Sequence, residues 1–441
     1  MSFQPEPGAT GPWRPTVAHV RAVGVAIVLC AIALLAGRPD LLVIATPFAV
    51  VAAWSTVTRP HTQPVVRDRF GNPSLREGDA TTWHADVHDL DEAVDLLTAQ
   101  MSPVPWVETI PEGGAATASV ERGVVPTISI ALRSLRWGRR SIEPIRLSAV
   151  SHWGAFECRS TSEHRSLHTL PLPAAFDSRA PLRPGTGLVG LSRASRSGEG
   201  SEFAGIRQFA VGDRMRRINW PRSLSSNDGL LVNATWADQD THVAFVVDAV
   251  ADYGSSEGVD GAASSLDTTV RAAGAIAEHV IGRGDRVSLR TFGTAAQQTI
   301  PPAAGAAHLR RVLDALTRLR SLRGTTSANR SRRTRPMREG GAELTVMLSP
   351  MISREALDQA VALGSHGATV VIIDTLPDDI AVDPDPYVAL AWRIRILERR
   401  REIRRVQQVG IPVVRWRGPG SLDQFLRDAA RRASAPRMRV R

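Results

Sequence analysis

Two aspartates lie at the end of a buried-strand pattern, where a protein could bind a cation or a phosphate. The run HVAFVVDAV, residues 242–250, is rich in Val and almost wholly apolar, as in a buried parallel strand. Ligands of open α/β sheets bind beyond the carboxyl ends of the strands. Asp248 at the end of this run is therefore a candidate ligand, with Asp252 following in the next loop. The alternative is that Asp248 only caps that loop.

A second group of charged residues precedes this strand, in GEGSEFAGIRQFAVGDRMRRINW, residues 198–220. Arginine and carboxylate side chains form two parallel hydrogen bonds, so this segment predicts an ion-pair network that fixes the β-rich part of the chain against the α/β part. A docking surface or an anion site is the alternative. Catalysis is not favoured, because no nucleophile and base occur beside the charges at a recognisable spacing. The charges of the network are Glu202, Asp213, Arg207, Arg214, Arg216 and Arg217.

Strand and helix patterns alternate over residues 237–441, which predicts a doubly wound parallel sheet. Strands are expected in the runs HVAFVVDAV, RVSLRTF, ELTVMLS, ATVVIIDT and IPVVRW. Helices are expected over 266–281, 308–319, 354–367, 387–410 and 421–433. Within the fourth helix, the Arg- and Glu-rich stretch 393–405 is interpreted as a solvated face.

Residues 59–173 predict a small all-β domain. Short alternating stretches such as TTWHADVHDL and VVPTISIALRSL are separated by Pro and Gly. The stretch EAVDLLTAQM fits either a helix or a strand. Residues 174–236 form a connector whose first part is rich in Pro, Gly, Arg and Ser, a composition that builds no core.

Residues 1–58 contain two uncharged apolar runs, 22–36 and 41–57, joined by a turn-forming cluster. Extended at their ends, both reach the length that spans a bilayer, so a transmembrane helical hairpin is expected. A signal peptide is disfavoured because a second apolar run follows at once. Arginines lie close to the two ends of the hairpin that are away from its turn. By the positive-inside rule, these ends and the soluble domains are expected in the cytoplasm, at the plasma membrane. These arginines are Arg14, Arg21, Arg59, Arg67 and Arg69.

The chain has 441 residues and a formal net charge of +10, and all 54 basic residues are arginine. Only two Tyr are present and no motif interleaves aromatic with base-reading side chains, so nucleic acid is not an expected partner. Two cysteines exclude a disulfide framework, and the lack of Lys excludes the usual phosphate loop. The arginine-rich stretch 327–338 is expected to be a solvated loop, or one that touches lipid headgroups or an acidic partner.

The α/β part resembles the von Willebrand factor A-like domain, whose first strand ends in Asp-x-Ser-x-Ser and binds a divalent cation. The resemblance implies ligand positions at Asp248, Asp252 and Ser349, and at Thr325 or Thr326. Val250 has no oxygen where the family has its first Ser, and Pro350 stands where an Asp would follow Ser349. Mg²⁺ is the cation such oxygens would bind, but the incomplete set favours a domain without a cofactor.

The segment before this domain is similar to the signature of the family called domain of unknown function 58, and the membrane hairpin and the order of the domains agree with it. The residues that carry the resemblance are Glu202, Phe203, Arg207, Phe209, Gly212, Asp213, Arg216, Ile218, Asn219 and Trp220. Members of that family typically occur alongside AAA+ ATPases of the MoxR type.

The resemblance implies a non-enzymatic, membrane-anchored adaptor that acts with such an ATPase in the assembly or maturation of client proteins. Two alternatives come from other classes. One is a metal-dependent hydrolase at the membrane face, and the other is a basic protein that binds lipid or nucleic acid through residues 327–338.

Overall fold

The computed structural model describes residues 11–121, 123–173, 197–210, 213, 215–225, 229–236, 242–294, 297–321, 344–365, 370–380, 385–418 and 420. Several predictions fall outside this range: those on Gly212, Arg214, Thr325, Thr326, the loop 327–338, the helix 421–433 and the first part of the connector. The side chains of Glu202, Phe203 and Arg216 also lie outside the description.

The chain divides into two compact units. The first comprises residues 1–172 together with 257–262, and the second comprises residues 173–256 and 263–441. The short segment 257–262 therefore belongs to the first unit, although it lies between two elements of the second along the chain. It forms an ion pair there, with Asp260 2.9 Å from Arg133.

The first unit begins with two helices, α1 (Val17–Ala36) and α2 (Asp40–Val57), which pack against each other. Both are long and apolar enough to cross a membrane, and their apolar windows are only 11% and 17% buried. A helix from the core of a soluble protein would be mostly buried, so this exposure suggests membrane association. Gly37, in the left-handed conformation with φ of 64°, ends α1 and allows the chain to reverse.

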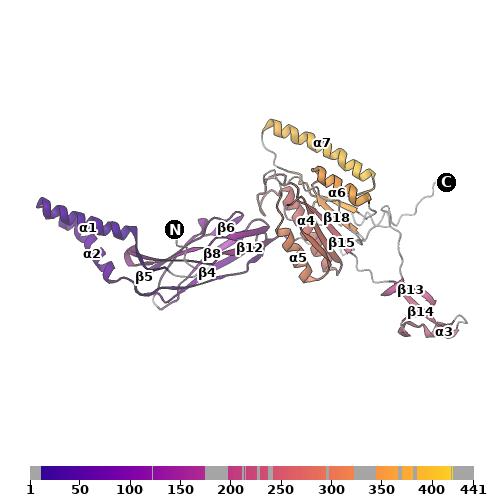
Figure 1. Ribbon diagram of the computed structural model, residues 1–441, viewed down its shortest axis with the longest axis horizontal. Helices are drawn as coiled ribbons and strands as arrows, with labels where there is room; N and C mark the ends of the chain where they lie inside the picture. Colours follow the sequence, from indigo (N-terminus) through magenta and orange to yellow (C-terminus); the bar gives the residue numbers. More distant parts are fainter. Residues whose placement is uncertain are drawn as a thin grey trace. The chain divides into compact units, whose positions relative to one another are not determined.

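The rest of the first unit is a β-sandwich-like structure with sheet orders β1-β11-β10-β5-β7, β2-β4-β8-β6 and β3-β12-β9 (Figure 1). One apolar core joins these sheets, and it includes Trp83 and Ile130 from one sheet and Ala99 and Leu147 from another. The all-β expectation is confirmed, and the ambiguous stretch EAVDLLTAQM is a strand. The strands are β1 (Arg14–Pro15), β2 (Val65–Phe70), β3 (Ser74–Arg76), β4 (Ala80–His88), β5 (Val94–Gln100), β6 (Val107–Ile110), β7 (Ala115–Ser119), β8 (Thr127–Ser134), β9 (Gly138–Ile142), β10 (Arg146–Ser151), β11 (Phe156–Thr161) and β12 (Arg165–Leu170).

The second unit contains a six-stranded sheet of order β17-β16-β15-β18-β19-β20. The five strands expected from the sequence are present, and they are parallel to one another. The sixth, β17, was not expected, because its sequence TIPPA has the two prolines that disfavour a strand interior. It pairs antiparallel at the edge of the sheet, where missing N–H donors cost least. The strands are β15 (His242–Asp248), β16 (Arg286–Phe292), β17 (Thr299–Ala303), β18 (Leu344–Ser349), β19 (Val370–Asp374) and β20 (Val413–Arg415).

Four helices cover this sheet, α4 and α5 on one face and α6 and α7 on the other (Figure 1). A capping box at Ser264 and Asp267 starts α4. The helices are α4 (Ser265–Gly282), α5 (Ala306–Thr317), α6 (Arg354–Ser365) and α7 (Pro386–Gln408). The four helices expected within the described range are confirmed.

The segment expected to be only a connector also has structure of its own. Strands β13 (Ser197–Gln208) and β14 (Leu231–Trp236) pair antiparallel, and η3 (Met215–Arg217) and α3 (Trp220–Ser225) lie between them in sequence. We call the described residues between 197 and 236 the signature module. The sequence did not predict this module, because its short apolar runs lie among Gly- and Ser-rich stretches that are typical of linkers.

Candidate functional site

The switch point of the six-stranded sheet lies between β15 and β18. From β15 the chain continues to β16 on one side, and it later returns to β18 on the other. Crevices at such points are where open α/β sheets bind ligands. Asp248 ends β15 and Ser349 ends β18, so the structure brings these two predicted residues together. Ser349 Oγ donates to Asp248 Oδ2 at 2.6 Å.

The Asp248 carboxylate is buried and held by the protein's own groups. Its second oxygen accepts a hydrogen bond from the backbone N–H of Val250 at 2.9 Å, so Asp248 does cap the following loop. Burial raises the pKa of Asp248 to about 6, against the opposing effect of the Ser349 and Val250 hydrogen bonds. A carboxyl group in this setting takes up a proton far more readily than an exposed one.

The carboxylate of Asp252 does not bind at the Asp248–Ser349 pair; its hydrogen bonds are to the start of α4. Its Oδ1 accepts from the backbone N–H of Leu266 at 3.0 Å and from Ser265 Oγ at 3.4 Å, at the start of α4. The negative charge lies at the positive end of a helix dipole, which stabilises it there. The two aspartates of the predicted cation site therefore serve two different local structures.

A hard cation does not fit the residues that the structure describes at this edge. It needs about six oxygens directed at one point, whereas both Asp248 oxygens are engaged and Ser349 Oγ also accepts from the backbone N–H of Met351 at 2.9 Å. Val250 and Pro350 supply no side-chain oxygen. Within the described ranges, no three His, Cys, Asp or Glu side chains gather as a metal cluster.

The loop after β18 closes this edge, and two arginines of α7 hold it. Arg399 Nε donates to the carbonyl oxygen of Pro350 at 2.7 Å, and Arg395 donates to the carbonyl oxygen of Ile352. Between them Met351 is fully buried and has a φ of 52°, a strained conformation for a residue of its size. The strain persists because the neighbouring carbonyls are fixed on both sides.

Arg399 also pairs with Asp374 at the end of β19, and both side chains are less than 10% exposed. Stretch 393–405 was interpreted as a solvated face, and for Arg395 and Arg399 that prediction was wrong. Sequence reasoning missed the pair because the high density of arginine in α7 hides which ones are buried. One signal in the sequence could have indicated the pair: Arg395 and Arg399 are four residues apart on one helix face, and Asp374 ends a strand.

The signature module contains one pair of the predicted ion network. The guanidinium of Arg207 forms two hydrogen bonds to the carboxylate of Asp213, at 2.6 and 2.5 Å. This pairing, with the N–H of Ala210, lowers the pKa of Asp213 to about 2. Arg207 lies near the end of β13 and Asp213 lies shortly after that strand, so the pair is local to the module itself. A role for it between domains stays a prediction.

The module presents apolar side chains to solvent. Met215, Trp220 and Leu224 are 77%, 55% and 83% exposed, and Leu230 is exposed as well. Their backbone is well anchored, because Ile218 and Val232 are buried and bridge to each other. Asn219 adds a side-chain hydrogen bond to Asn233 at 2.9 Å. Exposed apolar clusters on a fixed backbone are typical of protein interaction sites.

The start of the helical pair is fixed to one end of the β-sandwich. Thr16 donates its N–H to the carbonyl of Ala155 at 2.9 Å and its hydroxyl to the carbonyl of Gly154 at 2.6 Å. The ring of His19 lies 5.1 Å from that of Phe156. Next to these contacts, Trp153 has a φ of 61° and is 70% exposed. An exposed indole thus lies beside the first turn of α1.

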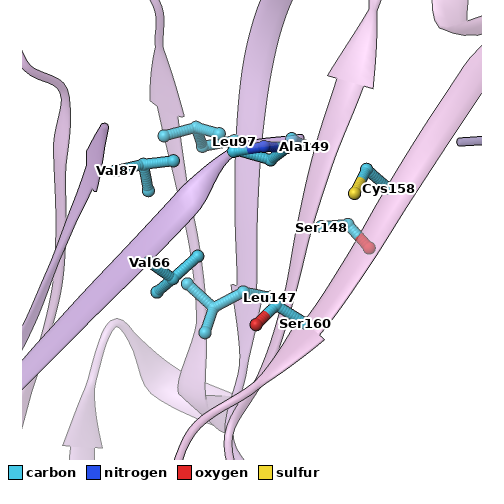
Figure 2. A pocket seen from close by; sticks show the side chains of 9 residues that line it. Val66, Val87, Leu97, Leu147, Ser148, Ala149, Cys158 and Ser160 are labelled. Atoms are coloured by element: carbon cyan, nitrogen blue, oxygen red, sulfur yellow. The ribbon is translucent and has the colours of Figure 1, made fainter. Parts of the chain in front are cut away.

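A small apolar crevice in the β-sandwich is lined by side chains of both larger sheets, among them Cys158 of β11 (Figure 2). Burial raises the pKa of the Cys158 thiol to about 11. Thiolates are the reactive form of cysteine, and Sγ lies 3.0 Å from the carbonyl oxygen of Gly11, to which the thiol donates. The crevice is a packing feature of the sandwich and does not hold an activated nucleophile.

The chain thus combines two helices long enough to cross a membrane with a β-rich unit and an α/β unit. Residues 205–383 match the model of the family described as Protein of unknown function DUF58, which supports the family indicated by the signature. The match begins within β13 and includes Arg207, Asp213, Trp220, Asp248 and Ser349. A search of curated proteins found no match.

Proposed function

We propose that this protein is a membrane-anchored adaptor that binds other proteins and carries out no reaction itself. In this account its α/β unit is a von Willebrand factor A-like domain whose cation site has been replaced by internal hydrogen bonds. The partner implied by the family resemblance is an AAA+ ATPase of the MoxR type. The shared task is the assembly or maturation of a client protein.

The observation that carries the proposal is the apolar surface of the signature module. Trp and Met are enriched at the centres of protein interfaces, where burying one large side chain contributes on the order of 2 kcal/mol. Met215, Trp220 and Leu224 are exposed, and their backbone is anchored by the buried bridge between Ile218 and Val232. A preorganised surface loses little entropy when it binds.

The membrane anchor is supported by the contacts at the base of α1. Because Thr16 and His19 contact Gly154 and Phe156, we infer that the boundary between the apolar helix and the polar domain lies near Trp153. Tryptophan is enriched at membrane–water interfaces, where its ring occupies the headgroup level. Arg14 and Arg59 flank the helical pair on the same side, which by the positive-inside rule corresponds to the cytoplasm. The soluble units are therefore proposed to face the cytoplasm at the plasma membrane.

Affinity purification from native membranes tests the proposal. The tagged full chain is expected to retain an AAA+ ATPase, identified by mass spectrometry. Replacing Trp220 and Leu224 with Ala is expected to lower the retained amount about tenfold or more, because two central contacts are lost. The matched control is Val361→Ala on α6, which removes an exposed apolar side chain of the same unit.

The control variant is expected to retain the ATPase at the wild-type level. The proposal is wrong if the wild-type chain retains no ATPase, and the assignment of the surface is wrong if the double variant retains as much as the wild type.

A further inference from the structure

Helix α7 is bound to its own unit by one face only. Trp392 lies against Tyr253 with their ring centroids 5.8 Å apart, Arg395 and Arg399 hold the loop 350–352, and Val406 belongs to the apolar core. With 3.6 residues per turn, these positions fall on one side of the helix. The helix therefore has a second, opposite side against which none of these four residues packs.

That opposite side carries a line of large apolar residues. Tyr387, Leu390, Ile394 and Leu397 are between 51% and 82% exposed. Their spacing of three, four and three residues is the a/d pattern of a coiled-coil seam. The line is about 15 Å long and covers roughly 80° of the helix circumference, which is narrower than the apolar face of a helix that lies in a membrane surface. We call these four residues the α7 seam.

The charges beside the α7 seam are almost all positive. Exposed residues of α7 include Arg393, Arg400, Arg401, Arg404 and Arg405, and the described part of the chain provides none of the five with an ion pair. The single exposed acid of the helix, Glu398, is 3.1 Å from Arg395 and is thereby compensated. Arg393 and Arg400 lie along one edge of the seam, seven residues apart, at the g positions of its heptad.

These charges select among the possible occupants. A second copy of the chain would place like-charged arginines across the seam, which is destabilising. A lipid surface suits a broad apolar face, and this seam is narrow. A helix with an a/d apolar line and acidic residues at its flanking e and g positions complements both the seam and its arginine edge.

We propose that the α7 seam is a docking site for an acidic amphipathic helix of a partner protein. This inference rests on the proposed adaptor function and adds a second binding surface of defined chemistry to it. The contacts that fix α7 to the loop 350–352 hold the seam in place, so the helix offers its apolar line without prior ordering.

The test uses two synthetic peptides of about three heptads, both with Leu at a and d. One has Glu at its e and g positions, and the other has Lys there. The full chain, in phosphatidylcholine nanodiscs, carries a polarity-sensitive fluorophore on Ala391→Cys beside the seam, with Cys30→Ala to leave one accessible thiol. Emission should shift to the blue and saturate with the Glu peptide, at a Kd about tenfold or more below that of the Lys peptide.

Ile394→Asp should weaken binding of the Glu peptide about tenfold or more, because it places a carboxylate in the seam. The control Val361→Asp, an exposed position on α6, should bind like the wild type. Both variants change charge equally, so only a local effect separates them. Unchanged thermal melting of Ile394→Asp checks that the exposed substitution leaves the fold intact.

Three results would overturn the inference. The first is that both peptides bind equally well, or that neither binds. The second is a blue shift with phosphatidylglycerol vesicles but not with the Glu peptide. The third is dimerisation of the wild-type chain that Ile394→Asp abolishes. Each of these would leave an ATPase recovered through the signature module unaffected. Absence of any ATPase from the native-membrane eluate would instead overturn the adaptor function.

Discussion

The edge of the α/β sheet and the signature module differ in which groups they bury: the sheet edge buries paired polar groups, and the signature module exposes large apolar ones. At the sheet edge, Asp248 and Ser349 are buried and bonded to each other, and Arg399 closes the loop above them. In the signature module the charged pair lies near the surface and large apolar residues face the solvent. A region whose buried polar groups hydrogen-bond to one another contributes to the stability of the fold. A region that leaves apolar surface exposed is suited to binding a partner.

The largest effect is expected from removing the buried ion pair. Arg399→Ala leaves Asp374 buried without its partner and frees the carbonyl of Pro350, which should destabilise the α/β unit by about 3–5 kcal/mol. Amide hydrogen exchange in β15 and β18 measures the free energy of opening of this unit.

An exposed pair provides the matched comparison. Asp314 in the last turn of α5 and Arg318 at its C-cap lie 2.8 Å apart and are much more exposed, so Arg318→Ala should cost less than about 1 kcal/mol. Similar losses for Arg399→Ala and Arg318→Ala would show that the loop after β18 is not held as described.

The pH dependence of stability should differ in sign between the two regions. Burial raises the pKa of Asp248 to about 6, so its folded form binds a proton more tightly than the unfolded chain does. Stability from this group is complete below pH 4 and is lost as pH rises towards 6. Asp248→Asn removes that loss, so its stability relative to the wild type should increase by about 3 kcal/mol between pH 4 and pH 7.

The opposite sign is expected for Asp213, whose pKa is lowered to about 2 by Arg207. Its contribution is present above pH 4 and is lost as pH falls towards 2. Hydrogen exchange in β14 of the wild type and of Asp213→Asn, measured across this range, should therefore diverge above pH 4 and converge near pH 2. A stability profile for Asp248→Asn parallel to that of the wild type would contradict the burial of Asp248.

A smaller loss is expected from the glycine that faces Asp248's loop. Gly293 has a φ of 74°, and a Cβ there would lie within 2.5 Å of the backbone of Val250. Gly293→Ala should destabilise the unit by about 2 kcal/mol, since both the backbone conformation and the close approach oppose it. Gly284→Ala is the control, because its φ of 90° is similarly left-handed but its surroundings are open. Equal losses of stability in the two variants would mean that the close approach of residue 293 to Val250 does not contribute to the cost of Gly293→Ala.

The smallest effect on stability is expected at the exposed surface of the signature module. Trp220→Ala should change stability by less than about 0.5 kcal/mol while it reduces partner binding. Hydrogen exchange in β13 and β14 of the free variant provides the measurement. A large loss of protection would mean that Trp220 supports the fold, so that reduced binding by the variant could not be assigned to a surface contact.

Much of the fold was predictable, because buried parallel strands such as 286–292 and amphipathic helices such as α4 have strong local patterns. The edge strand β17 was missed because its prolines are tolerated only where no neighbour needs their N–H groups. The hairpin β13–β14 was missed because its pairing joins residues some thirty positions apart, and no local pattern encodes such a contact.

The candidate site was predictable in part. Asp248 and Ser349 meet because parallel strands end at a common edge, and Arg207 pairs with Asp213 because only six residues separate them along the chain. The closing loop could not be foreseen, since the strain at Met351 and the burial of Arg399 depend on how α7 packs. The same holds for the α7 seam, whose exposure depends on which face of the helix the sheet occupies.

Hydrogen–deuterium exchange on the full chain, alone and as the complex isolated from native membranes, compares the two regions in one measurement. The account predicts slower exchange in the complex over residues 215–225 and 229–232, with no change over 248–252 and 349–352. Protection confined to the sheet edge, with the signature module unchanged, would contradict it.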